Sequence, residues 1–191
     1  MANKAMDTTL LDRAIQFAVK AHGGTERRGK GFPYVVHPLE AVAIAATISP
    51  DQEILAAAAL HDVLEDTCVT AEELEKEFGH RVTQLVMEET DKFFAGISEA
   101  QSWTERKKIA MERLKNASRD AKIVAMGDKL SNARAIWRDY KEKGDELWKI
   151  FHVHDKALHK WHYEGLADAL SELSDSFAYK EFEFLIHDIF D

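Results

Sequence analysis

The sequence DQEILAAAALHDVLEDT, residues 51–67, contains the feature that decides the fold. An apolar run over residues 54–60 is followed at once by one histidine and three acids, namely His61, Asp62, Glu65 and Asp66. Because each residue of an α-helix advances by about 100°, this stretch predicts one helix over 51–66 with these four side chains on one side.

The acidic end of this helix calls for a partner. The preceding turns on the same side carry Ile54, Leu55 and Ala58, so a solvated face would have to begin abruptly at the histidine. The simple alternative is an amphipathic helix that shows its charges to water. Burying ionised carboxylates costs several kcal/mol each unless they are paired or bind a cation. A metal ion would be such a cation.

Helical spacing of apolar residues recurs along most of the chain, which predicts an all-α helical bundle. With 191 residues, of which 46% are hydrophobic, we expect a single domain over residues 1–191. Its core covers about 9–173, and the stretch FAYKEFEFLIHDIF, residues 177–190, is a candidate final helix that extends it. The helices expected within the core cover residues 9–22, 38–47, 51–66, 70–78, 79–94, 102–116, 119–139, 145–151 and 155–173.

Local signals mark several boundaries. Asp51 is a candidate N-cap, Thr70 with Glu73 makes a capping box, and Gly79 ends the helix that the box begins. The segment 22–34 has four glycines and, counting its histidine, four basic residues, so we expect a loop.

Charge and composition restrict the partners and the compartment. A formal charge of −9 argues against broad nucleic-acid binding, which needs a surplus of Lys and Arg. No apolar run approaches the roughly 20 residues that cross a bilayer, and no signal peptide follows Met1. The single cysteine, Cys68, cannot form an intramolecular disulfide. We therefore expect a soluble cytoplasmic protein without nucleic-acid or membrane partners, and the oligomeric state stays open.

Two further segments contribute candidate metal ligands. His37 precedes Pro38 at the expected start of a helix, and Asp128 lies in IVAMGDKLSNARAIW, residues 123–137, on an apolar stripe and four residues before Asn132. A satisfied structural histidine and an ion-paired acid are the alternatives. With His61 and Asp62 they offer two imidazoles and two carboxylates, a set that suits Mn²⁺, Fe²⁺, Co²⁺ or Zn²⁺ better than Ca²⁺.

This H…HD…D arrangement resembles the HD superfamily of metal-dependent phosphohydrolases. The segments RGKGFPYVVHP, AALHDVLEDT, FGHRVTQLV and MGDKLSNAR follow in the order and spacing of the hydrolase domain of the RelA/SpoT family, which removes the 3′-pyrophosphate from (p)ppGpp. The tail from residue 148 to 170 is similar to that of stand-alone small alarmone hydrolases.

The resemblance implies specific roles. It implies a metal ion, Mn²⁺ by preference, bound by His37, His61, Asp62 and Asp128, with Glu65 and Asp66 as the acids that activate water. It implies substrate contacts from Arg28, Tyr34 and Asn132. Many family members have Lys directly after this arginine, whereas Gly29 stands here. The cluster Arg106, Lys107 and Lys108 could face the pyrophosphate or be a solvated charged face.

Three functions are therefore in competition. The first is Mn²⁺-dependent hydrolysis of (p)ppGpp, or of the adenosine alarmone (p)ppApp, to pyrophosphate and a nucleoside 5′-phosphate such as GDP or GTP. The second is an HD phosphatase acting on another nucleotide such as NADPH. The third is a catalytically idle nucleotide-binding regulator, against which the intact pair Glu65 and Asp66 argues. We predict no metal site in the histidines near the C-terminus, namely His152, His154, His159 and His162, because their spacing gives no clean ligand pair.

Overall fold

The structure is a computed structural model that describes residues 6–90 and 99–191. Within these ranges the chain is built of helices and forms no β-strand, apart from an isolated bridge between Glu26 and Pro33. The predicted all-α fold is confirmed. The α-helices are α1 (Thr9–Ala21), α2 (Val36–Ala45), α3 (Gln52–Leu60), α4 (Val63–Asp66), α5 (Ala71–Phe78), α6 (His80–Glu89), α7 (Glu99–Lys115), α8 (Arg119–Lys143), α9 (Lys156–Ala169) and α10 (Phe177–Phe190), and the 3₁₀ helices are η1 (Gly144–Ile150) and η2 (Ser171–Leu173).

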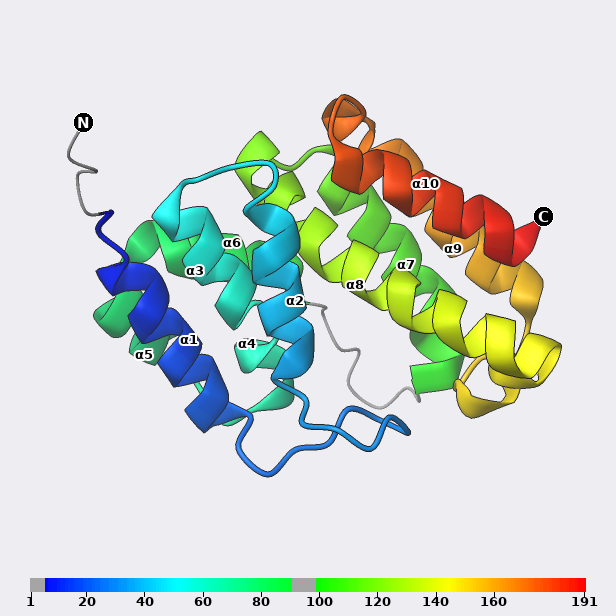
Figure 1. The fold of residues 1–191 in the computed structure, drawn as a ribbon, viewed down its shortest axis with the longest axis horizontal. Helices are drawn as coiled ribbons and strands as arrows, with labels where there is room; N and C mark the ends of the chain where they lie inside the picture. Colours follow the sequence, from blue (N-terminus) through cyan, green and yellow to red (C-terminus); the bar gives the residue numbers. More distant parts are fainter. Residues whose placement is uncertain (1–5, 91–98) are drawn as a thin grey trace.

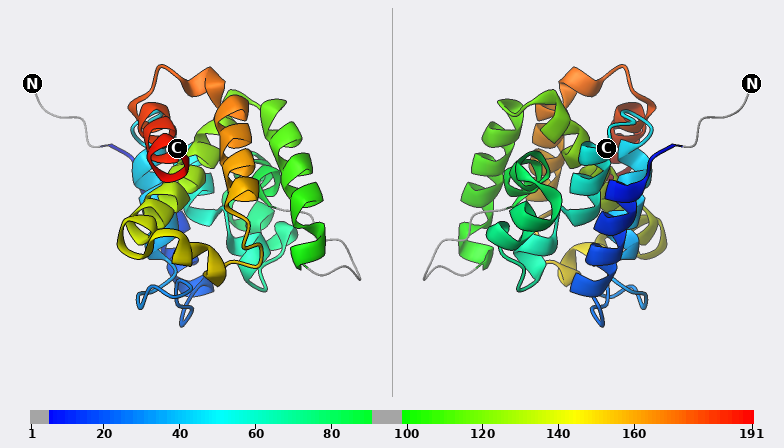
Figure 2. Two further views of the ribbon diagram at one scale, coloured as in Figure 1. Left: turned by 90° about the vertical axis from the view of Figure 1, so that its right-hand side faces the viewer. Right: turned by 90° about the vertical axis from the view of Figure 1, so that its left-hand side faces the viewer.

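Helix α8 runs through the middle of the molecule (Figure 1). Helices α2, α3 and α6 pack on it from the N-terminal half, and α10 packs on it from the C-terminal half. The turned views show α7 and α9 side by side (Figure 2). Because α8 contacts both halves, residues along it can meet side chains from either one.

The crossing of α2 and α8 is close because α8 has a glycine there. A Cβ atom on Gly127 would lie 2.6 Å from the carbonyl oxygen of Ala41 on α2, well inside van der Waals contact. Around the crossing, buried side chains such as Ile44, Val124 and Met126 fill the core. This close approach brings the start of α2 beside the middle of α8.

The predicted helix signals are confirmed at several ends. The Asp51 side chain accepts a hydrogen bond from Glu53 N at 2.9 Å, and Thr70 forms the predicted capping box with Glu73. Gly79 ends α5 with φ of 85°, a left-handed conformation that glycine adopts without strain. The candidate final helix is confirmed as α10, while the extent of the domain stays a prediction.

The predicted single helix over 51–66 is wrong, because α3 ends at Leu60 and α4 begins at Val63. The imidazole Nδ1 of His61 donates to Ala58 O at 2.9 Å, and this is the carbonyl that a continuing helix would offer to Asp62 N. The shared helical side inferred from a regular 100° step therefore does not apply beyond Leu60.

Other boundaries differ less. The segment predicted as helix over 145–151 is the 3₁₀ helix η1, and α8 runs to Lys143 rather than to residue 139. The expected helix over 79–94 corresponds to α6, and its last residues, from 91 on, lie outside the described residues. The loop over 22–34 is confirmed as turns and bends. In the described ranges, no helix has the length and apolar character needed to span a membrane.

Candidate metal centre

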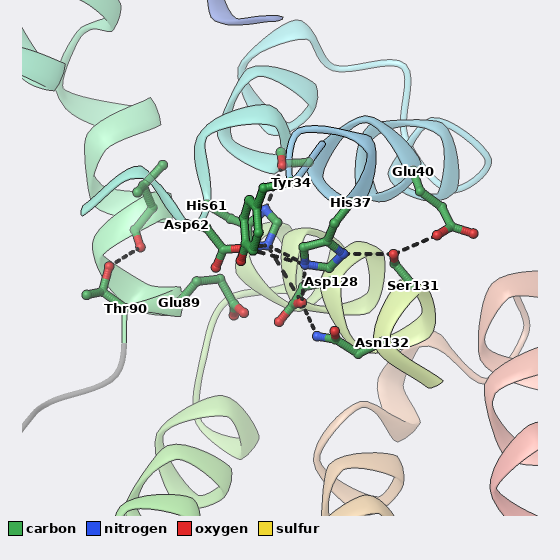
Figure 3. Close-up of polar contacts among 12 residues, drawn as sticks. Tyr34, His37, Glu40, His61, Asp62, Glu89, Thr90, Asp128, Ser131 and Asn132 are labelled. Atoms are coloured by element: carbon green, nitrogen blue, oxygen red, sulfur yellow. Dashed lines mark hydrogen bonds and ion pairs between the residues drawn. The ribbon is translucent and has the colours of Figure 1, made fainter. Parts of the chain in front are cut away.

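Two buried histidines face each other at the centre of the site. His37 lies in the first turn of α2, and His61 directly follows α3. Their Nε2 atoms are 3.2 Å apart, and their Nδ1 atoms contact oxygens, His37 that of the Ser131 hydroxyl at 2.8 Å and His61 that of Ala58 (Figure 3). Because a carbonyl oxygen only accepts, Nδ1 of His61 carries a proton, and Nε2 is the nitrogen that faces the centre and can bind an ion.

Two carboxylates complete this cluster. Asp62 Oδ2 lies 3.0 Å from His61 Nε2 and 3.5 Å from His37 Nε2. Asp128 Oδ1, from the middle of α8, lies 3.1 Å from His37 Nε2 and 3.6 Å from His61 Nε2. One ligand atom each from His37, His61 and Asp128 lies within 4.8 Å of the others, which is the arrangement that a bound ion requires.

The electrostatics of the cluster favour a cation. Burial raises the pKa of Asp62, but the neighbouring His61 and His37 hold it well below its usual range. Burial also raises the pKa of Asp128, but Lys129 and the two histidines likewise hold it well below that range. Burial lowers the pKa of His61, yet Asp62 and Asp128 hold it well above its usual value. Two ionised carboxylates that attract a proton so strongly to a buried imidazole would also attract a divalent ion, so the residues fit a metal.

The carboxylates are themselves held by neighbours. Asp128 accepts hydrogen bonds from Lys129 Nζ and from the Asn132 amide, both at 2.5 Å. Lys129 also pairs with Glu89 at 3.1 Å. The Tyr34 hydroxyl donates to Asp62 Oδ2 at 2.7 Å, and burial together with this carboxylate raises the pKa of Tyr34, so it stays a donor. Such contacts orient metal-binding carboxylates.

The cluster opens into a cavity of about 420 Å³ between the glycine-rich loop, α7, α8 and α9. Glu65 lines it, as do the metal-centre residues and the expected substrate residues Arg28, Tyr34 and Asn132. Asp66 is exposed and lies near enough to the Tyr34 hydroxyl to act on its pKa. The expected metal ligands, catalytic acids and substrate residues thus lie in or beside one site, with Asp66 at its edge.

Arg27 was not among the residues expected from the sequence. It donates a hydrogen bond to Asn132, and its guanidinium carbon lies 5.2 Å from the centre of the Tyr34 ring. Arg28 contacts His152 at 3.2 Å, in an exposed position. The two arginines are adjacent in a loop, where no periodicity tells which one turns inward.

The three basic residues of the cluster on α7 point to different sides of the helix. Arg106 is buried, Lys107 lines the cavity and Lys108 is exposed, as expected for consecutive residues about 100° apart around the axis. Lys108 thus has the solvated position that one alternative gave the cluster, while Lys107 faces the cavity and its contact with a pyrophosphate stays a prediction. Among the C-terminal histidines, His159 and His162 line the far wall of the cavity, and Nε2 of His159 lies 2.8 Å from Val153 O.

The helical fold brings histidines and aspartates together in a cavity, which is the arrangement expected for the metal-dependent phosphohydrolases that the sequence resembles. A family model described as "HD domain" matches residues 14–152, and the chain belongs to this family. The predicted resemblance is confirmed.

Several named relatives share most of the chain. A Xenopus tropicalis protein named guanosine-3′,5′-bis(diphosphate) 3′-pyrophosphohydrolase MESH1 is 36% identical over 135 residues, which is 69% of this chain and 72% of that protein. The Homo sapiens MESH1 protein is 36% identical over 131 residues, which is 67% of this chain and 70% of that protein. An Aquifex aeolicus protein named guanosine-3′,5′-bis(diphosphate) 3′-pyrophosphohydrolase is 28% identical over 174 residues, which is 90% of this chain and only 24% of that protein.

Two solved structures share the fold. One, described as a metazoan orthologue of SpoT that hydrolyses ppGpp, has a TM-score of 0.73 and 24% identity, over 98% of this chain and 97% of that chain. A Listeria monocytogenes protein has a TM-score of 0.69 and 27% identity, over 84% of this chain and 97% of that chain.

Proposed function

We propose that the protein is a Mn²⁺-dependent hydrolase that removes the 3′-pyrophosphate from alarmone nucleotides of the ppGpp type, with the adenosine analogue as a further substrate. The observation that carries the proposal is the convergence of four nitrogen and oxygen ligands, namely His37, His61, Asp62 and Asp128, at one end of a cavity that basic side chains also line. The printed names of the relatives, which share up to 36% identity with this chain, support the same reaction.

In this proposal His37, His61, Asp62 and Asp128 hold the ion. When bound, the ion lowers the pKa of a water molecule and polarises the phosphoryl group. A mixed set of imidazoles and carboxylates fits Mn²⁺, and the hydrogen bonds from Tyr34 and Asn132 keep the carboxylate oxygens in place.

The acids of α4 supply the proton acceptor. Glu65, which lines the cavity, accepts the proton from the attacking water, while Asp66 supports it from beside Tyr34. Water adds to the phosphorus attached to the 3′ oxygen, and the bond from that phosphorus to the 3′ oxygen breaks. The sugar oxygen leaves with a proton as a hydroxyl group. Hydrolysis of ppGpp thus gives GDP and pyrophosphate, with the 5′-diphosphate unchanged.

Basic and polar residues of the cavity hold the nucleotide. Tyr34, Asn132 and Arg28 contact the nucleoside, and Lys107 and Arg27 offer charges to the phosphates.

A product assay tests the proposal. Purified protein with Mn²⁺ is given ppGpp, ppApp or NADPH, and pyrophosphate and orthophosphate are measured separately. His61→Ala, prepared in the same way, controls for contaminating hydrolases. Pyrophosphate with GDP supports the proposal. Release of orthophosphate alone, from NADPH or any other nucleotide, would replace it with a general phosphatase, and no turnover would favour the idle regulator.

A further inference from the structure

A chain of polar contacts holds the ring of His37 on the side away from the metal centre. Its Nδ1 lies 2.8 Å from the Ser131 hydroxyl, and this hydroxyl lies 2.7 Å from Glu40 Oε2 (Figure 3). Ser131 is only 2% exposed, so water does not replace these contacts. His37 and Glu40 lie one turn apart on α2, and Ser131 lies one turn after Asp128 on α8.

The direction of these hydrogen bonds fixes the state of the histidine. A carboxylate only accepts, so the single hydroxyl proton of Ser131 goes to Glu40. The hydroxyl oxygen must then accept from Nδ1–H of His37. With its proton on Nδ1, His37 presents the Nε2 lone pair toward His61 and Asp128, and this is the tautomer that a metal ligand needs.

The series of polar contacts behind His37 continues to helix α10. Arg134 donates to Glu40 Oε1 at 3.1 Å and forms two hydrogen bonds, both 2.7 Å, to the carboxylate of Glu181 on α10. Paired hydrogen bonds of this kind restrict the guanidinium to one plane. Glu181 and Glu40 raise the pKa of Arg134 against the effect of burial, so it stays charged. These hydrogen bonds connect helices α2, α8 and α10 to a single candidate metal ligand, His37.

We propose that Ser131 and Glu40 are positioning residues that hold His37 in its ligand tautomer. Arg134 and Glu181 connect Glu40 to helix α10, so the position of α10 also affects His37. The inference rests on the metal centre of the proposed function, and it is independent of which nucleotide is hydrolysed. Partners behind metal-binding histidines typically contribute 10- to 100-fold in metal affinity.

A purely structural ion-pair network would behave differently, and the chain offers one as a control. Arg81 donates to Asp51, Glu53 and Asp120 at 2.9, 2.5 and 2.8 Å, and its side chain is 38% exposed against 32% for Arg134. These three acids lie outside the metal centre. Loss of Arg81 should therefore change stability without changing the binding of an ion.

The experiment measures Mn²⁺ binding directly on metal-free protein, by calorimetric titration, with thermal unfolding of the same samples. The variants are Ser131→Ala, Glu40→Gln, Arg134→Ala and Arg81→Ala. We expect the dissociation constant to rise about 10- to 100-fold in the first two, to rise less in Arg134→Ala, and to stay at the wild-type value in Arg81→Ala. Glu40→Gln keeps the size of the side chain, so it decides the question if Ser131→Ala does not fold.

A spectroscopic measurement adds a readout independent of affinity. In ¹⁵N-histidine-labelled protein, the metal-free wild type should show His37 with its proton on Nδ1. Ser131→Ala should lose this preference, since neither the hydroxyl nor the charge behind it then fixes the proton. His61, whose Nδ1 donates to Ala58 O, should keep its Nδ1 proton in the same sample.

The outcomes separate the two levels of inference. Wild-type protein that bound no divalent ion would overturn the metal centre and this inference with it. Wild-type binding with unchanged affinity and unchanged His37 tautomer in Ser131→Ala and Glu40→Gln would overturn the positioning role alone. An equal loss of affinity in Arg81→Ala would show a general effect of stability and would also overturn it.

Discussion

Arg27 donates a hydrogen bond to Asn132, and the Asn132 amide donates in turn to Asp128 at 2.5 Å. The neighbouring Arg28 instead contacts the exposed His152 at 3.2 Å. One arginine of the loop is thus two hydrogen bonds away from a candidate metal ligand, while the other lies at an exposed edge of the cavity. The two should contribute to activity in different ways.

We expect Arg28→Ala to raise KM with little change in kcat, because its guanidinium can contact substrate without touching the metal ligands. We expect Arg27→Ala to lower kcat as well, since it frees Asn132 and loosens Asp128. Steady-state kinetics on ppGpp measure both constants. A fall in kcat confined to Arg28→Ala would reverse this assignment.

Metal removal should lower stability. An ion that binds the folded protein and not the unfolded chain adds about 2.7 kcal/mol to the free energy of unfolding at 100 times its dissociation constant. Thermal unfolding of chelator-treated protein should therefore shift upward on addition of Mn²⁺. His61→Ala lacks one imidazole ligand, so its melting temperature should move far less. Equal shifts in both proteins would place the ion elsewhere.

The acids of α4 should act on turnover rather than on metal binding. Glu65→Gln and Asp66→Asn preserve size and remove the charge, so we expect bound Mn²⁺ to be retained and kcat to fall. Loss of a general base typically costs about 10²- to 10⁴-fold. Metal content and kcat of the same preparations test this. Both acids are exposed, but Glu65 lines the cavity and Asp66 lies at its edge, so the larger loss should come from Glu65→Gln.

Features that depend on a few neighbouring residues could be predicted from the sequence. The capping box of Thr70 and Glu73 and the end of α5 at Gly79 are set by local hydrogen bonds, and both are confirmed. The break after Leu60 is different. It depends on the His61 ring, which bonds to Ala58 O and turns its other nitrogen toward residues far along the chain.

His61, Asp62 and Asp128 stand out in the sequence as polar groups next to apolar residues, and His37 joins them through its place at a helix start and the family resemblance. Their surroundings could not be chosen in this way. Ser131 and Glu40 are ordinary polar residues of two helices, 91 positions apart, and they meet only because Gly127 lets α2 approach α8 closely. The choice between Arg27 and Arg28 likewise depends on how a loop folds against α8, for which the chain has no periodic signal.

The stability of the metal-free protein should fall below about pH 6.5 through His159, among other groups. Burial lowers the pKa of His159, although its hydrogen bond to Val153 O and the charge of Asp155 partly oppose this. The unfolded chain, with the usual histidine pKa near 6.5, then binds the proton more readily, so stability present above that pH is lost as the pH falls. His159→Gln can keep a donor for Val153 O and cannot titrate. Urea unfolding at pH 7.5 and 5.5 should show a smaller loss in this variant, and an equal loss would assign the effect to other groups.

Lys107 and Lys108 offer a matched test of where the phosphates lie. They are adjacent on α7, yet Lys107 lines the cavity and Lys108 is exposed. We expect Lys107→Ala to raise KM for ppGpp about 10-fold or more, since a charge-assisted hydrogen bond is worth roughly 1.5–3 kcal/mol, and Lys108→Ala to leave KM unchanged. The two variants change the net charge equally. If the lysines acted only by long-range attraction of an anionic substrate, both variants would therefore bind the substrate more weakly, to a similar degree. Kinetics at low and at physiological ionic strength separate these cases. Equal rises in KM that disappear with salt would remove Lys107 from the binding site, whereas a rise confined to Lys107→Ala that persists in salt would place a phosphate beside α7.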